Sequence, residues 1–497
     1  MFLIHTNTNQ ELYGYNIIFN QFYVSSRPNL FNFSPVFYVS VINFYTCYNF
    51  LVKSFVRCHQ KAAYPKSNVT PLLKQLEAKL RLTGPITIAD YMKEVLVNPV
   101  QGYYMSKDVF GPRGDFVTSP EISQIFGELI AVWFLLEWKK MGECKPLHII
   151  ELGPGRGTLS SDLLRVISKY SDLSKHVSLH FVEVSPHLRA MQEELLCKNA
   201  SPTLKETSQK LTHHGIPVHW YSDLKEVPPG FTCLIANEFF DALPIHKFVK
   251  KESGWKEVLI DVDFDSGPHH LKYVLSNGPT PASKIFIQVD LLCLRKTGIN
   301  TRRQVTAPLV EPHYQQEHYG KQAFSKNESK DQVEVCPKAG IITQDISRRI
   351  KECGGCALIA DYGHCGDNGD TFRAFKNHKL HHPLCEPGTA DLTASVDFSY
   401  INRIVADDAI SFGPISQESF LKSLGIKIRF QKLMKVANPE EEKTLRSAYE
   451  MLIDPCDMGG KFKFLAIFPA VLKDFLIKFP PTGFSSESTI SSSRSFN

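Results

Sequence analysis

The sequence predicts an α/β fold built around a mainly parallel, doubly wound sheet. Short apolar runs of strand length alternate with stretches of helical periodicity through the middle of the chain. A glycine-rich turn at 153–157 directly follows one of these apolar runs. Acidic residues close three other runs, as Glu183, Glu238 and Asp361 show, and ligands of such sheets bind beyond the carboxyl ends of the strands.

Regular structure begins near residue 70 with helices. The pair Thr70-Pro71 is a helix-start signal, and the leucines over 72–80 lie at helical spacing. A second helix is predicted over 87–96. A third begins at Ser119, which a proline and an acid follow at the positions that the first turn of a helix prefers, and it continues through residue 136.

The middle of the chain supplies the predicted sheet. Buried strands are expected over 147–150, 177–184, 232–236 and 356–360, with a terminal strand over 461–468. Helices over 159–170 and 341–350 give the alternation typical of a parallel sheet. The runs 258–262 and 271–275, separated by Asp, Ser and Gly, predict an additional strand pair.

These elements place one domain over 67–475. Residues 1–66 hold a single acid and few basic residues, which fits either a mitochondrial transit peptide or a mispredicted start. Polar residues interrupt the apolar stretch in this leader, so we expect no stable membrane insertion. Residues 291–326 lose periodicity and are interpreted as an irregular insertion. The Ser-, Pro- and Phe-rich residues 476–497 are predicted to form a disordered tail.

Composition narrows the function. A net charge of +5 over 497 residues is too small to argue for nucleic acid or an anionic membrane as a partner. The 12 cysteines are scattered, and several lie in apolar runs, which favours reduced thiols over disulfides. Cys353 and Cys356 form a C-x-x-C that precedes a strand, and no second cysteine pair has zinc-site spacing, so no metal is predicted.

The turn is the strongest sign of a ligand. Gly153, Gly155 and Gly157 let the backbone turn sharply and approach a ligand closely, and the following helix offers free N–H groups. A dinucleotide site prefers a small residue where Thr158 stands, and the acid Glu151 would repel a pyrophosphate. The same carboxylate can help to hold an ammonium group, so we predict S-adenosylmethionine as the cofactor.

Glu183 strengthens this prediction. It closes the next predicted strand, a little beyond the offset of the ribose-binding acid in dinucleotide folds. A carboxylate at this place can accept hydrogen bonds from both ribose hydroxyls. We therefore interpret Glu183 as a cofactor-binding residue, although a solvated acid at a strand end would look the same in isolation.

Four sequence blocks point to a family. They are GDFVTSPEISQ at 114–124, ELGPGRGT at 151–158, NEFFDALP at 237–244 and GTADLT at 388–393. In this order they resemble the MidA-type family, whose animal members are mitochondrial protein arginine methyltransferases that serve as assembly factors of respiratory complex I. The resemblance covers residues 69–468, apart from the stretch 291–326, which is foreign to the family.

The resemblance carries several implications. It implies a class I methyltransferase fold, a Rossmann-like doubly wound sheet with extra helices. It implies S-adenosylmethionine as the cofactor and the mitochondrial matrix as the compartment. It also implies symmetric dimethylation of an arginine on the 49 kDa subunit of complex I, early in assembly.

Arginine methylation requires acids beside the cofactor. A guanidinium is always charged and its lone pairs are delocalised, so it is a poor nucleophile. Carboxylates can accept its N–H bonds in pairs and localise density on the attacking nitrogen. Glu238 and Asp241 directly follow a strand and are predicted to be catalytic, the alternative being an acid pair at a helix start. Asp115, Asp361 and Asp391 remain open as substrate contacts or turn residues.

Two other functions remain open from the sequence. A non-catalytic assembly factor would use the same fold to hold a subunit, and cofactor binding without turnover would support it. An intact glycine turn and both acids argue against that reading. A Rossmann oxidoreductase is the other alternative, and Thr158 argues against it.

Overall fold

The computed structural model describes residues 67–484, except 107–108, 110, 112–113, 116, 198–209, 266, 288–329 and 407. The predicted leader 1–66 and the predicted insertion 291–326 lie outside the described residues. Within the part of the chain that is described, no helix has the length and apolar character needed to cross a membrane.

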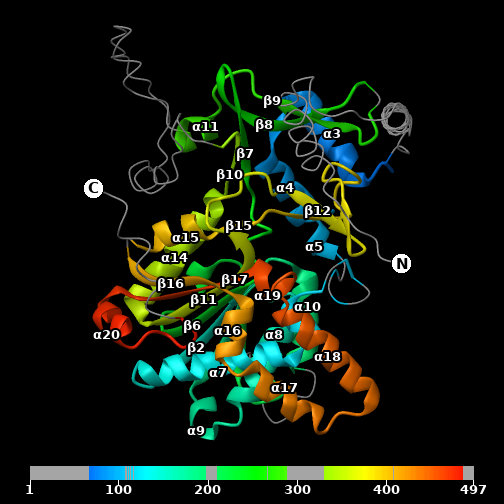
Figure 1. Ribbon diagram of the computed structural model, residues 1–497. Coiled ribbons are helices and arrows are strands. Elements are labelled where there is room, and N and C mark those ends of the chain that lie inside the picture. Colours follow the sequence, from blue (N-terminus) through cyan, green and yellow to red (C-terminus); the bar gives the residue numbers. More distant parts are fainter. Residues whose placement is uncertain are drawn as a thin grey trace, which may run out of the picture. The chain divides into compact units, whose positions relative to one another are not determined.

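The largest sheet of the described residues has nine strands (Figure 1). Its strands run in the order β16-β17-β11-β6-β2-β3-β5-β4, and β15 pairs with β11 at the side. The five central strands are parallel: β2 (Leu147–Leu152), β3 (Val177–Val182), β5 (Pro217–Tyr221), β6 (Phe231–Asn237) and β11 (Gly355–His364). The other strands of this sheet are β4 (Lys210–Leu211), β15 (Val396–Asp397), β16 (Ala409–Ser416) and β17 (Phe462–Pro469). The predicted parallel, doubly wound sheet is thus confirmed.

The chain places successive strands on opposite sides of β2. From β2 it moves to β3 and β5 on one side, and then to β6 and β11 on the other. The order therefore reverses between β2 and β6, and ligands of open α/β sheets bind at such a point. The predicted terminal strand exists as β17, and it lies antiparallel to β11.

Helices cover both faces of the sheet, which explains the nearly continuous apolar strands. Along β2, Ile149 packs with α7 (Gln124–Lys140) and α8 (Thr158–Ile167), while Ile150 faces the opposite core. That second core includes α14 (Pro337–Cys353) and α15 (Phe398–Val405). Because neighbouring side chains of a strand point to opposite faces, both faces of β2 are buried, and most of its positions are apolar.

The predicted helix from Ser119 is divided in the structure. α6 (Ser119–Ile122) ends at Ser123, whose backbone is extended with φ −159° and ψ 135°. The Ser123 hydroxyl accepts a hydrogen bond from the Ile125 amide and caps α7. The capping preference of serine thus overrides the helical periodicity of the surrounding apolar residues.

A second region carries two smaller sheets beside the N-terminal helices α3 (Pro71–Thr83) and α4 (Ile88–Val97) (Figure 1). The first small sheet comprises β1 (Ile86–Thr87), β7 (His246–Lys251), β8 (Gly254–Val262), β9 (Leu271–Leu275) and β10 (Gln332–Val335). The predicted pairing of the runs 258–262 and 271–275 is confirmed as the antiparallel pair β8 and β9. The second small sheet comprises β12 (Arg373–Lys376), β13 (Lys379–His381) and β14 (Asp391–Thr393).

The remaining elements are short helices and a C-terminal helical group. They are α5 (Tyr103–Ser106), α9 (Ser171–Ser174), α10 (Pro186–Cys197), η2 (Leu224–Glu226), α11 (Pro281–Phe286), α16 (Gln417–Ser423), α17 (Ile426–Met434), α18 (Pro439–Ile453), α19 (Met458–Lys461), η4 (Ala470–Leu472) and α20 (Lys473–Lys478).

The predicted disordered tail is wrong over 476–484. The Trp133 indole donates a hydrogen bond to the Thr482 carbonyl at 3.0 Å, and the Thr482 amide donates to Glu137 at 2.9 Å. Phe484 is 3% exposed and packs in the core with Trp133. Serine and proline content suggested disorder, but one aromatic anchor and two backbone hydrogen bonds fix this segment. Residues 485–497 lie outside the described part.

We expect Phe484→Ala to lower the free energy of unfolding by about 3–5 kcal/mol, because the change opens a cavity in the core. The matched control is Phe479→Ala, since Phe479 is 51% exposed and its truncation should change stability by only about 0.5 kcal/mol. Urea unfolding of both variants measures the difference. Equal stabilities would show that the segment does not contribute to the fold.

Candidate active site

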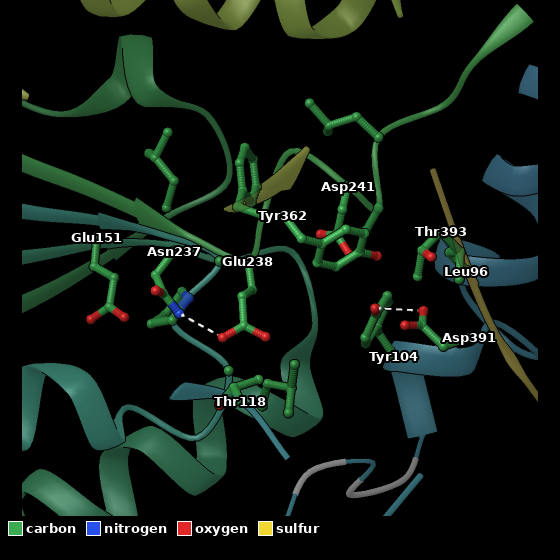
Figure 2. Close-up of a pocket in the computed structure, with 18 of the residues that line it drawn as sticks. Leu96, Tyr104, Thr118, Glu151, Asn237, Glu238, Asp241, Tyr362, Asp391 and Thr393 are labelled. Carbon is green, nitrogen blue, oxygen red and sulfur yellow. Dashed lines mark hydrogen bonds between the residues drawn. The ribbon is translucent and has the colours of Figure 1, made fainter. Parts of the chain in front are cut away.

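A cavity of about 1240 Å³ opens at the carboxyl ends of the central strands, where the strand order reverses. Its wall contains the predicted glycine turn, the acids Glu151 and Glu183, and the acids Glu238 and Asp241. Figure 2 shows Glu151, Glu238 and Asp241 in succession across this cavity. The structure therefore brings the predicted cofactor-binding and catalytic residues into one site.

The glycine turn has the backbone conformation that its sequence predicts. Gly153, Gly155 and Gly157 have φ values of 61°, 54° and 86°, in the region that L side chains rarely adopt. A Cβ atom on Gly153 would lie 2.6 Å from the Phe239 ring. α8 begins directly after Gly157, so its first N–H groups face the end of β2.

Glu121 holds the turn from the side. Its carboxylate accepts a 2.5 Å hydrogen bond from the Thr158 hydroxyl and pairs with Arg156 at 3.3 Å. It also occupies the first turn of α6, as predicted. The contact with the cofactor turn was not predicted, because 35 residues of sequence separate the two partners and no local pattern joins them.

Glu151 is buried directly below the turn. It is 3% exposed, and the Ser160 hydroxyl donates a 2.5 Å hydrogen bond to its Oε2. Burial raises the pKa of Glu151 to about 8, the Ser160 hydrogen bond lowers it, and the neighbouring charge of Glu183 raises it further. A cationic ligand group beside Glu151 would favour its ionised form.

Glu183 is linked to the turn through Gln192. The Gln192 amide donates to the Gly155 carbonyl at 2.7 Å and to Glu183 Oε2 at 3.3 Å. Glu183 Oε1 accepts from the Ser185 amide at 2.7 Å. Burial raises the pKa of Glu183, and these hydrogen bonds lower it. Glu183 is thus a buried acid fixed in the cavity wall rather than a solvated strand end.

The raised pKa of Glu151 predicts a pH-dependent stability. Between its ordinary value of 4.5 and about 8, the folded protein keeps a proton that the unfolded chain releases, so the free energy of unfolding falls as pH rises. Glu151→Gln should flatten this slope and stabilise the cofactor-free protein at pH 8.5 by a few kcal/mol. Urea unfolding at pH 5 and pH 8.5 measures both slopes, and identical slopes would contradict the prediction.

Asn237 is the last residue of β6, and Glu238 and Asp241 follow it. Glu238 has φ 49°, an unusual conformation for a non-glycine residue, and its amide donates to the Ala360 carbonyl at 2.8 Å. Glu238 Oε1 accepts a 2.8 Å hydrogen bond from the Ser119 amide. Burial raises the pKa of Glu238 to about 7, against the lowering effect of the Ser119 amide.

Asp241 lies further along the cavity and is held by Tyr362. The Tyr362 hydroxyl donates a 2.6 Å hydrogen bond to Asp241 Oδ2. Burial raises the pKa of Asp241, and the Tyr362 hydrogen bond and the charge of Arg373 lower it. The guanidinium carbon of Arg373 lies 4.9 Å from the centre of the Tyr362 ring.

The structure shows different contacts for the three acids whose roles the sequence left open. Asp361 Oδ2 accepts hydrogen bonds from the amides of Phe239, Phe240 and Asp241, so it shapes the loop that carries the predicted catalytic acids. Asp115 lines the cavity, but the Tyr103 hydroxyl and the Asn377 amide both bind its carboxylate at 2.7 Å. Asp391 also lines the cavity.

The cavity fits the predicted cofactor. Glycines keep the turn open, and buried carboxylates face the space where an ammonium group and ribose hydroxyls need acceptors. Asn237 Oδ1 is buried without a hydrogen-bond partner in the described part of the chain. Over the same residues, no group of three or more His, Cys, Asp or Glu side chains could hold a metal ion.

Comparisons with known proteins agree with this site. The model of a family of S-adenosyl-L-methionine-dependent methyltransferases matches residues 129–415. The mitochondrial protein arginine methyltransferase NDUFAF7 of Homo sapiens is 44% identical over 409 residues, which cover 81% of this chain and 84% of the human protein. Its Drosophila melanogaster homologue is 44% identical over 427 residues, with 83% and 88% covered.

A solved structure shows the same fold. A protein of Burkholderia thailandensis bound to S-adenosyl-homocysteine superposes with a TM-score of 0.59 at 24% identity, over 80% of this chain and 92% of that one. S-adenosyl-homocysteine is what S-adenosylmethionine becomes after losing its methyl group, and S-adenosylmethionine is the cofactor of this fold and family. The chain therefore belongs to the NDUFAF7 family of S-adenosylmethionine-dependent methyltransferases.

Proposed function

We propose that this protein transfers a methyl group from S-adenosylmethionine to an arginine side chain of a mitochondrial protein. The observation that carries the proposal is a pair of carboxylates on the cavity wall next to the glycine turn, the half-buried Glu238 and the buried Asp241. A guanidinium is a planar cation with five N–H donors, and carboxylates are its preferred acceptors. The names of the relatives, which are arginine methyltransferases, support the same substrate class.

Separate residues hold the two reactants. Glu151, Glu183 and the turn that contains Gly153, Gly155 and Gly157 would hold the cofactor, which supplies a methyl group on a sulfonium. Glu238 and Asp241 would bind the guanidinium and orient one nitrogen toward this methyl carbon. The bond between the methyl carbon and the arginine nitrogen would form as the carbon–sulfur bond breaks. The electron pair of the broken bond would stay on sulfur.

The methylated nitrogen then releases one proton. Glu238, with its pKa raised to about 7 by burial, is suited to accept that proton at neutral to slightly basic pH. Ser119 and Tyr362 fix the orientation of the two carboxylates, because each donates to one of their oxygens. The described residues thus supply binding, orientation and a proton acceptor.

The finer proposal concerns the target. We propose symmetric dimethylation of an arginine on the 49 kDa subunit of complex I, in the mitochondrial matrix, and a role in complex I assembly. Support comes from the four sequence blocks at 114–124, 151–158, 237–244 and 388–393. It also comes from the relatives, which are named as mitochondrial proteins.

The test uses the full chain with methyl-tritiated S-adenosylmethionine and mitochondrial proteins from cells that lack the enzyme. Radiolabelled symmetric dimethylarginine after acid hydrolysis, located by mass spectrometry on the 49 kDa subunit, is the expected result. Label on another amino acid would overturn arginine as the acceptor. Asymmetric dimethylarginine would overturn only the proposed product, and cofactor binding without transfer would favour a non-catalytic assembly factor.

A further inference from the structure

The sequence block GTADLT at 388–393 ends in a strand that faces the cavity. β14 comprises Asp391, Leu392 and Thr393, and side chains of a strand alternate between its two faces. Leu392 belongs to the apolar core around α3 and α4, whereas Asp391 and Thr393 both line the cavity. The alternation therefore presents two polar side chains to the space beyond Asp241.

Asp391 is a buried carboxylate with a fixed orientation. It is 4% exposed, and the Tyr104 hydroxyl donates a 2.7 Å hydrogen bond to its Oδ1 (Figure 2). Burial raises the pKa of Asp391 to about 7, and the charge of Asp241 raises it further against the Tyr104 hydrogen bond. The two acids are thus close enough to interact, and a cation between them would relieve their repulsion.

Thr393 supplies an independent sign of a missing partner. Its side chain is buried, with 2% exposure, and its hydroxyl makes no hydrogen bond within the described ranges. A buried hydroxyl without a partner is unfavourable, because it loses its hydrogen bonds to water without replacing them. Figure 2 shows Thr393 beside Asp391, across the cavity from Glu151.

The substrate guanidinium of the proposed reaction needs more hydrogen-bond acceptors than Glu238 and Asp241 readily supply. One oxygen of Glu238 already binds the Ser119 amide, and one oxygen of Asp241 already binds the Tyr362 hydroxyl. A guanidinium has five N–H donors, and each one left unpaired in a buried site weakens binding. Asp391 and Thr393 lie in the same cavity as both acids.

We propose that Asp391 and Thr393 form a third binding element for the substrate guanidinium, opposite the pair Glu238 and Asp241; this inference rests on the proposed function. Asp391 accepts guanidinium N–H bonds, and the Thr393 hydroxyl accepts one more. The cavity wall also includes the apolar residues Leu96 and Leu243, which suit the methylene groups of an arginine side chain. A lysine ammonium, with three donors at one point, would not span these separated acceptors.

A structural role is the competing interpretation of Asp391. In that case its hydrogen bond with Tyr104 only joins α5 to β14, and the loss of the carboxylate would change stability but not substrate affinity. The two roles predict different measurements, because only the binding role makes guanidinium affinity depend on Asp391 while cofactor affinity stays the same.

The experiment is a calorimetric titration of the full chain with acetyl-arginine methylamide in the presence of saturating S-adenosyl-homocysteine. Asp391→Asn should weaken binding of this probe by about 10-fold or more, and Thr393→Val by roughly 3- to 10-fold. Affinity for S-adenosyl-homocysteine should change by less than about twofold in both variants, since neither residue belongs to the proposed cofactor side.

Glu334→Gln is the matched control. Glu334 accepts hydrogen bonds from the Thr371 hydroxyl and from the Thr371 and Phe372 amides, close to β12 but outside the cavity lining. This variant should lose stability and keep the affinity for the arginine probe. If Asp391→Asn fails to fold, Thr393→Val decides, because valine keeps the shape of threonine and removes only the hydroxyl.

The outcomes separate the inference from the proposed function. Wild type that binds the probe, with both variants binding equally well, overturns the role of Asp391 and Thr393 and leaves arginine as the substrate. Wild type that binds S-adenosyl-homocysteine but not the probe contradicts both. Weaker binding in both variants, with unchanged binding in Glu334→Gln, supports the third element.

Discussion

Replacing Glu238 with glutamine is expected to lower methyl transfer by on the order of 10³-fold and to change cofactor affinity by less than about twofold. Glutamine keeps the shape of the side chain and can still accept the Ser119 hydrogen bond. It cannot offer a negative charge to the guanidinium, and it cannot take up the released proton. The effect should therefore appear in kcat rather than in cofactor binding.

The measurement is turnover with saturating tritiated cofactor, together with calorimetric binding of S-adenosyl-homocysteine. Glu257→Gln is the matched control, because Glu257 is a buried carboxylate that lies on β8 and pairs with His246 outside the cavity lining. It should keep the wild-type kcat even if it lowers stability. Undiminished turnover in Glu238→Gln would remove Glu238 from the mechanism.

The sequence predicts the central sheet well because its signals are local. Four of the five parallel strands are short, mostly apolar runs that the sequence predicts, and the positive-φ glycines of the cofactor turn follow β2 directly. The fifth, β5, was missed, because its sequence PVHWY shows no such run. The strands of the smaller sheets are less visible. β7 contains three lysines, and β14 is only three residues long, so neither shows the continuous apolar pattern of a strand that is buried on both faces.

The residues of the candidate site also differ in whether they carry a local sequence signal. Glu238 and Asp241 can be predicted because they follow a strand in the chain. The residues that orient them cannot, because Ser119 lies 119 positions before Glu238 and Tyr362 lies 121 positions after Asp241. Such partners meet only in the folded chain: Tyr362 reaches Asp241 because the ends of β6 and β11 lie side by side, and Ser119 reaches Glu238 from the start of α6. Gln192, which joins the turn to Glu183, carries no sequence signal of its own.

The second large effect is expected from a substitution in the glycine turn. Gly153→Ala is expected to weaken binding of S-adenosyl-homocysteine by about 100-fold, because overpacking at this contact is unfavourable by roughly 1–3 kcal/mol and must displace a wall of the cavity. The added Cβ would lie 2.6 Å from the Phe239 ring, so either the turn or the ring has to move. Both line the cavity, and Phe239 directly follows Glu238.

Gly215→Ala separates this contact from backbone strain. Gly215 also has a positive φ, 76°, but a Cβ there meets no atom within 4 Å, and Gly215 lies in the turn before β5. Both variants therefore carry a comparable conformational penalty, and only Gly153→Ala adds the clash with Phe239. We expect both variants to lose a similar amount of stability, and only Gly153→Ala to lose affinity for the cofactor. That result would place the cofactor against the turn. Unchanged affinity in a folded Gly153→Ala would mean that the cofactor binds without close approach to Gly153, and the assignment of the turn would have to be abandoned.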